Sequence, residues 1–229
     1  MNRRAIRVVS LVPSVTESLL TWGVVPIAVT RFCEQPSLRA IGGTKDPDIA
    51  AIVALHPDLV VVNDEENRSE DAVQLESEGM VLHVTRVRTL ADVGPCLEAL
   101  ADAVGVRYRA DPLVASAATT RARAFVPIWR RPWMTMNADT YGSSVLATVG
   151  VTNVYADEPE RYPTTTVLDA RDRLPDLVVA PSEPYPFGER HVRELETVAA
   201  DVRLVDGRDL FWWGTRSAEA VERLREALG

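Results

Sequence analysis

The sequence has little of what a nucleic-acid binder, a disulfide-rich protein or a membrane protein needs. Its 25 Lys and Arg residues against 33 Asp and Glu give a formal charge of −8, so there is no basic surplus to displace counterions from phosphate, and nucleic acid is excluded as a partner. The two cysteines, Cys33 and Cys96, are far apart and are predicted to be ordinary thiols. No apolar run approaches the roughly 20 residues of a membrane span, so no membrane insertion is expected.

Catalytic signatures are also scarce. The three histidines, His56, His83 and His191, have no second histidine at metal-ligand spacing, so we predict no metal ligand. Ser14 follows a predicted strand but lacks the glycine-flanked elbow that exposes a nucleophile. No phosphate-binding glycine loop follows any strand. We therefore predict no catalytic residue and no required cofactor.

What the sequence does contain is a regular alternation of short apolar runs and amphipathic segments. With 229 residues, 46% of them hydrophobic, the chain can bury a substantial core. Runs at 7–11, 27–30, 59–62 and 81–84 are typical of strands, and the intervening segments of helices, which predicts α/β units with mainly parallel sheets. Ser14 and Glu17 have capping-box spacing for the first helix. The run 6–12 is interpreted as a strand and not as an export signal. A cytoplasmic location is therefore expected, or an extracytoplasmic one if a signal lies upstream.

An internal duplication indicates two similar lobes. The segment 57–61, Pro-Asp-Leu-Val-Val, returns at 175–179, and each copy leads through a polar loop into an amphipathic helix. A further strand follows each helix, at 81–84 and at 202–205. The segment 11–23 similarly resembles 136–150, with a strand, a polar turn, a helix and a glycine. We predict Rossmann-like lobes at 1–105 and 127–229, because a solenoid would need three or more copies.

A helical connector is predicted between the lobes, at 106–126. Asp111 and Pro112 supply an N-cap and a first-turn proline for a helix that runs to about Phe125. At ~1.5 Å per residue such a helix is roughly 20 Å long. A stiff connector implies that any gap between the lobes is largely preformed.

Ligands of open α/β sheets bind beyond the carboxyl ends of the strands, so the post-strand loops carry the candidate contacts. Eight of the fourteen Phe, Trp and Tyr residues lie in these loops, which is typical of a site for a large, flat, partly apolar ligand; the alternative is that individual rings seal loop bases. Arginines near the loops could clamp an anion or simply pair with neighbouring acids; they are Arg31, Arg86, Arg161, Arg208 and Arg216. The predicted contacts are Pro13, Ser14, Arg31, Phe32, Glu65, Glu66, Asn67, Tyr141, Glu183, Tyr185, Phe187, Trp212 and Trp213.

Several of these motifs together resemble a known family. The segments 9–17 and 52–60, the glycine at position 79, the predicted connector and the second Pro-Asp motif resemble the helical-backbone (class III) substrate-binding proteins of ABC importers, and most closely their cobalamin-binding branch. The resemblance implies a small-molecule ligand held in the cleft between the lobes. That ligand would be cobalamin first, or a siderophore or haem. It also implies docking on an ABC permease and ATPase through Glu70 and Glu189. An intracellular cofactor-handling protein or enzyme on the same scaffold is the alternative.

Overall fold

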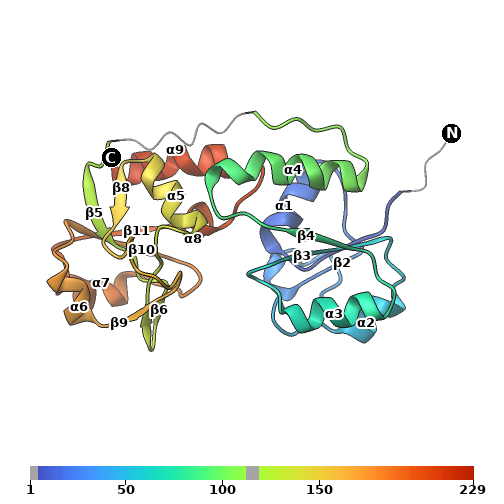
Figure 1. Cartoon of the computed structure of the whole chain (residues 1–229), viewed down its shortest axis with the longest axis horizontal. Coiled ribbons are helices and arrows are strands. Elements are labelled where there is room, and N and C mark those ends of the chain that lie inside the picture. The colour runs from blue at the N-terminus through green and yellow to red at the C-terminus, as the bar shows by residue number, and fades with distance from the viewer. Residues whose placement is uncertain (1–4, 112–118) are drawn as a thin grey trace. The chain divides into compact units, whose positions relative to one another are not determined.

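The computed structural model describes residues 5–111 and 119–229, and these divide into two compact units (Figure 1). The first unit comprises residues 5–87 and 92–111, and the second comprises residues 88–91 and 119–229. Each unit contains a four-stranded parallel sheet with helices on both faces. This is the predicted α/β class with mainly parallel sheets.

The sheet of the first unit has the order β2-β1-β3-β4. Its strands are β1 (Val8–Ser10), β2 (Ala28–Val29), β3 (Leu59–Asn63) and β4 (Leu82–Thr85). All residues of β1 and β3 are buried, as continuous apolar runs in central parallel strands should be. The helices are α1 (Pro13–Thr21), the 3₁₀ turn η1 (Arg31–Cys33), α2 (Ile49–Ala54), α3 (Ser69–Ser77) and α4 (Leu90–Val104).

The sheet of the second unit repeats this order as β8-β5-β10-β11. Its strands are β5 (Ala122–Phe125), β8 (Val151–Asn153), β10 (Leu177–Pro181) and β11 (Asp201–Val205). Helices α6 (Val167–Asp172) and α7 (Glu189–Leu195) pack on the core around Phe125 and Val178. The remaining helices are α5 (Tyr141–Thr148), α8 (Gly207–Phe211) and α9 (Ser217–Leu228).

The duplication extends to individual hydrogen bonds. The Asp58 carboxylate accepts the backbone N–H of Arg7 at 2.8 Å, and the Asp176 carboxylate accepts that of Arg123 at 2.7 Å. Each arginine side chain in turn donates to a carbonyl just before its Pro-Asp motif. The Pro-Asp pair therefore fixes the start of the third strand against the first strand in both units.

The second unit has a hairpin that the sequence reasoning missed. Strands β6 (Trp129–Arg130) and β7 (Trp133–Met134) pair antiparallel and join β9 (Thr164–Thr165) in a third, three-stranded sheet. Within the described residues the first unit has no such sheet, because β1 leads directly into α1. The counterpart of β1 is therefore β5. The expected match of 11–23 with 136–150 holds for the helix and its glycine, α1 with Gly23 and α5 with Gly150, but the strand before α5 belongs to the hairpin.

The predicted capping box was also wrong. Helix α1 begins at Pro13, two residues earlier than expected, and Val12 is its extended N-cap without a side-chain hydrogen bond. A proline at the first helical position is pre-set for the helix and has no N–H to satisfy. Pro13 therefore displaced Ser14 from the capping position.

The predicted connecting helix at 106–126 is corrected at both ends. Residues 106–111 and 119–121 are not helical, and Ala122–Phe125, expected to end the helix, form β5. Ala124 and Phe125 are fully buried between β10 and β8, and this tertiary burial outweighs the helix preference of an alanine-rich stretch. Residues 112–118 lie outside the described residues, so a stiff connector and a preformed gap between the lobes remain predictions.

Candidate functional site

The candidate contacts of each unit follow the carboxyl ends of its parallel strands. In the first unit Pro13 follows β1, Phe32 follows β2 and Glu65 follows β3. In the second unit Glu183 follows β10 and Trp212 lies at the end of α8, which follows β11. Because the strands within each sheet are parallel, these loops share one edge of their own sheet, which we call the carboxyl edge of that unit.

Phe32 is the most open aromatic ring of the first carboxyl edge, with 50% of the residue exposed. The neighbouring Arg31 side chain is also half exposed, but it is engaged by Asp46. The Arg31 guanidinium pairs with the Asp46 carboxylate at 2.9 and 3.0 Å and lies 4.8 Å from the centre of the Phe32 ring. The pair packs over Gly43, where a Cβ would come within 2.4 Å of the Asp46 carboxylate. Arg31 therefore supports Phe32.

The loop after β3 is held by two asparagines. The Asn63 side-chain oxygen accepts the N–H groups of Glu65 and Glu66 at 2.9 and 3.1 Å. The Asn67 oxygen accepts the N–H of Asn63 at 2.7 Å, and its amide nitrogen donates to the carbonyls of Leu11 and Thr44. Asn67 is buried and uses both amide hydrogens within the unit. It shapes the Glu65–Glu66 loop, and we leave it out of the contact set.

Ser14 is the one residue of the first edge with an unmatched polar atom. It is 3% exposed, and its hydroxyl has no hydrogen-bond partner among the described residues. A buried hydroxyl without a partner is uncommon in native proteins and has a free-energy cost. Because this oxygen is inaccessible from the surface, the unmatched hydroxyl belongs to the interior of the unit.

Trp212 lies at the second carboxyl edge, and neighbouring side chains hold its ring in place. It is half-buried, and its indole N–H donates to the Glu183 carboxylate at 2.9 Å. The guanidinium carbon of Arg216 lies 5.9 Å from the ring centre. Arg216 in turn pairs with the buried Asp209 at 2.8 Å, and Arg223 pairs with the same carboxylate at 2.7 Å. Glu183 thus positions Trp212 and leaves part of the ring open.

Three other predicted contacts of the second unit belong to its core. Trp213 is 3% exposed, Phe187 5% and Tyr141 7%. The Tyr141 hydroxyl lies 2.9 Å from Ser217 Oγ, and burial raises the pKa of Tyr141 to about 12. These rings are buried because they close the loop bases, which is the alternative that the sequence left open. We leave them out of the contact set.

An aromatic cluster surrounds the hairpin. Phe187 stacks on Trp133 with ring centres 5.8 Å apart and planes 11° apart, and Tyr185 packs against Phe187 at 4.7 Å. Trp129 meets Tyr185 edge-on at 5.5 Å and is 43% exposed. Sequence reasoning missed both tryptophans.

The candidate anion clamp is fully paired. Each of the five arginines named from the sequence lies within 3.7 Å or less of an aspartate carboxylate. The arginines therefore pair with neighbouring acids, which is the alternative that the sequence left open. The pairs are Arg31–Asp46, Arg86–Asp64, Arg161–Asp139, Arg208–Asp206 and Arg216–Asp209.

His191 connects the loop after β10 to α7. Its Nδ1 accepts the N–H of Gly188 at 3.1 Å, and its ring lies against Tyr185 and Phe187. Burial first, then the positive charges of Arg190 and Arg130, hold the pKa of His191 below its ordinary value of 6.5, against the opposing effects of Glu194 and the Gly188 hydrogen bond. The neutral ring is the form that caps α7.

Replacing His191 with Gln is expected to reduce the free energy of unfolding that the protein loses in mild acid. In the unfolded chain His191 takes up a proton near pH 6.5, whereas its lowered pKa keeps it neutral at that pH in the folded chain. Stability is therefore intact above this pH and falls as pH falls below it, by at most about 1.4 kcal/mol per pH unit. Gln keeps an acceptor for the Gly188 N–H without titrating. Urea unfolding at pH 7.5 and pH 5 checks this. If His191 played no part, wild type and His191→Gln would lose the same free energy of unfolding between the two pH values. His83→Gln is the control, because burial also lowers the pKa of His83.

Comparison with curated proteins finds relatives named vitamin B12-binding protein. The one from Vibrio parahaemolyticus serotype O3:K6 is 25% identical over 200 residues, covering 77% of this chain and 71% of the relative. The one from Photorhabdus laumondii is 26% identical over 192 residues, covering 76% of this chain and 70% of the relative. No protein-family model matches the chain.

Solved structures match over nearly the whole chain. The periplasmic vitamin B12-binding protein BtuF of Vibrio cholerae superposes with a TM-score of 0.78 at 22% identity, over 98% of this chain and 96% of that one. The chain has the fold of a class III substrate-binding protein. The periplasmic haem-binding protein RhuT from Roseiflexus sp. RS-1 matches equally well, at 0.78 and 18% identity over 98% of both chains. The resemblance drawn from the Pro-Asp motifs is confirmed.

The two acids expected to dock a class III protein on its transporter have equivalent places in the two units. Glu70 lies in the first turn of α3, which follows β3, and Glu189 begins α7, which follows β10. Both are exposed. Their equivalence follows from the duplication, and their docking role remains a prediction.

The described residues contain neither a candidate metal site nor a helix that could cross a membrane. No group of three or more His, Cys, Asp or Glu side chains within them could hold a metal ion. Among the helices of residues 5–111 and 119–229, none combines the length and the apolar composition that crossing a bilayer requires.

Proposed function

We propose that this chain is a non-catalytic binding protein for cobalamin that serves an ABC importer. The observation that carries the proposal is the similarity, over about three quarters of the chain, to proteins named vitamin B12-binding protein. The fold supports it, because BtuF of Vibrio cholerae has the same arrangement. No activity is assigned to any residue.

The chemistry of the two carboxyl edges supports a corrinoid. Phe32 in the first unit and Trp212 in the second present partly open rings, which suit the flat face of a macrocycle. In the first unit the loop of Glu65 and Glu66 adds polar groups at the same carboxyl edge. Pro13 and Ser14 are buried, like the rings left out above. The proposed contacts, with the half-buried Tyr185 added from the sequence, are Phe32, Glu65, Glu66, Tyr185 and Trp212.

The paired arginines favour cobalamin over haem. Haem carries two propionate groups that need cationic partners, whereas cobalamin surrounds its macrocycle mainly with uncharged amides. The five arginines near the carboxyl edges are already paired with aspartates, so their positive charge is offset and a propionate would gain less from them. Amides need hydrogen-bonding partners and no net charge.

The proposed partner is the permease and ATPase of an importer, contacted through Glu70 and Glu189. The solved relatives described above are named as periplasmic proteins, and capture by a permease from outside requires that compartment. The cytoplasmic location expected from the sequence would instead fit the alternative, an intracellular corrinoid-handling protein. Cell fractionation in the native host distinguishes the two roles.

Calorimetric titration of the purified chain with cyanocobalamin tests the ligand. We expect one site with a Kd of about 1 µM or tighter. Phe32→Ala is expected to raise the Kd about three- to tenfold, the contribution of one stacked ring. Val73→Ala, on α3 of the same unit and 64% exposed, is the matched control and should leave the Kd unchanged. Absence of heat at high micromolar cobalamin would remove the proposal.

A further inference from the structure

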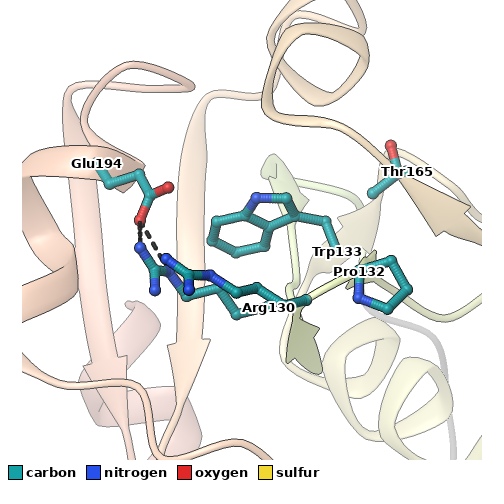
Figure 2. A pocket seen from close by; sticks show the side chains of 6 residues that line it. Arg130, Pro132, Trp133, Thr165 and Glu194 are labelled. Atoms are coloured by element: carbon teal, nitrogen blue, oxygen red, sulfur yellow. Dashed lines mark hydrogen bonds and ion pairs between the residues drawn. The ribbon is translucent and has the colours of Figure 1, made fainter.

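The hairpin of the second unit forms a pocket that the proposed function does not use. The pocket has a volume of 420 Å³ and lies between β6, β7, β9 and α7 (Figure 2). The first unit builds a sheet of the same order without a hairpin, so the repeated core does not require this addition. The lining residues are Arg130, Arg131, Pro132, Trp133, Thr165 and Glu194.

The pocket carries one uncompensated positive charge. Arg130 is neutralised, because its Nε and Nη2 donate to one Glu194 oxygen at 3.0 and 2.8 Å, as Figure 2 shows. Arg131 is exposed, and in the described part of the chain its side chain makes neither an ion pair nor a hydrogen bond. A guanidinium in this state can offer its planar fork to a carboxylate.

The pocket also has a rigid aromatic wall. The Trp133 indole lines it and is fixed from behind, since it stacks on the buried Phe187 and contacts the buried Phe125 with ring centres 6.4 Å apart. A fixed ring loses little conformational freedom when another ring packs on it. A volume of this size lies within the range of small-molecule sites, about 300–1,000 Å³.

We propose that this pocket binds a small aromatic carboxylate, with the ligand ring against Trp133 and its carboxylate on the Arg131 guanidinium. The lone cation selects an anion, and the indole selects a planar apolar body. The site belongs to the second unit alone and uses none of the proposed cobalamin contacts, so it stands or falls independently of the cobalamin proposal.

Nitrogen-15 spectra of the full chain, titrated with 2-naphthoate, test the proposal. The Trp133 indole N–H, assigned with Trp133→Phe, should shift saturably at or below about 10 mM probe. Arg131→Gln should raise the Kd about fivefold, as loss of an exposed ion pair does. Arg107→Gln, an exposed arginine of the first unit, should leave it unchanged. Neutral 2-naphthamide should bind wild type about as weakly as 2-naphthoate binds Arg131→Gln.

Three results would overturn the proposal. One is a titration in which Trp133 does not respond. Another is equal affinity for 2-naphthoate and 2-naphthamide, or for wild type and Arg131→Gln, because the cation would then have no role. The third is displacement of 2-naphthoate by saturating cyanocobalamin, which would make the pocket part of the corrinoid site. An unchanged Trp133 response in the presence of cobalamin supports a separate site, and a chain that binds 2-naphthoate but not cobalamin contradicts the proposed function alone.

Discussion

Trp212→Ala is expected to weaken cobalamin binding about 30-fold, a loss of about 2 kcal/mol that is typical of a central aromatic contact. The reason is that the ring is both open and fixed. Its indole N–H is held by Glu183 at 2.9 Å, and Arg216 lies against the ring. A ring held in place before binding contributes its contact area at low entropic cost. Calorimetric titration of the variant with cyanocobalamin measures the effect.

Variants of Glu183 test how much the positioning of Trp212 contributes to cobalamin binding, apart from the contact made by the ring itself. Glu183→Gln keeps an oxygen acceptor for the indole N–H and should change the Kd by less than about threefold, whereas Glu183→Leu removes it and should weaken binding about fivefold. Trp22→Ala, at the opposite end of α1 from the carboxyl edge of the first unit, is the control. If Trp212→Ala and Trp22→Ala bound cobalamin alike, Trp212 would not be a ligand contact.

Asp209→Ala is expected to lower the free energy of unfolding of the second unit by about 3 kcal/mol, because it leaves a buried charge without its partner. Asp209 is 5% exposed as a residue and accepts hydrogen bonds from Arg216 and Arg223. The Arg216 side chain is only 15% exposed, so little water reaches it to replace the lost carboxylate. Urea unfolding monitored by tryptophan fluorescence reports the change.

The matched control for Asp209 is an exposed ion pair of the same unit. Asp201 pairs with Arg203 at 3.0 Å, and both side chains are about a third or more exposed. Asp201→Ala should therefore cost less than about 1 kcal/mol. A loss in Asp209→Ala no larger than that in Asp201→Ala would mean that the two arginines find other partners or water.

The parallel sheets were predictable because most of their central strands are short, buried and mainly apolar. The Pro-Asp motif was informative for a stronger reason. It repeats a specific set of backbone contacts, as Asp58 and Asp176 show, so the repeat in sequence reflects a repeat in structure. Local patterns were less reliable. Ser14 and Glu17 have capping-box spacing, yet Pro13 starts the helix. Ala122–Phe125 has helix-forming composition, yet burial makes it a strand.

Strand order was enough to say which loops share an edge of each sheet, but not what each side chain does there. The topology of a parallel sheet brings the post-strand loops to one edge, so those loops could be named from the sequence. What a side chain does within a loop depends on its burial and partners. Asn67 bonds to backbone groups more than twenty residues away in sequence, and Tyr141 to Ser217, and neither contact has a sequence signal. The hairpin escaped detection because its strands are two residues long.

Native mass spectrometry of the chain mixed with equimolar cyanocobalamin and haem tests the central claim most directly. Both compounds compete for the same protein, so the spectrum reports preference as well as binding. We predict one dominant complex that contains one chain and one cobalamin. The rings at the carboxyl edges suit a macrocycle, whereas the arginines are already paired. A dominant haem complex, or a chain that remains free of both, would contradict it.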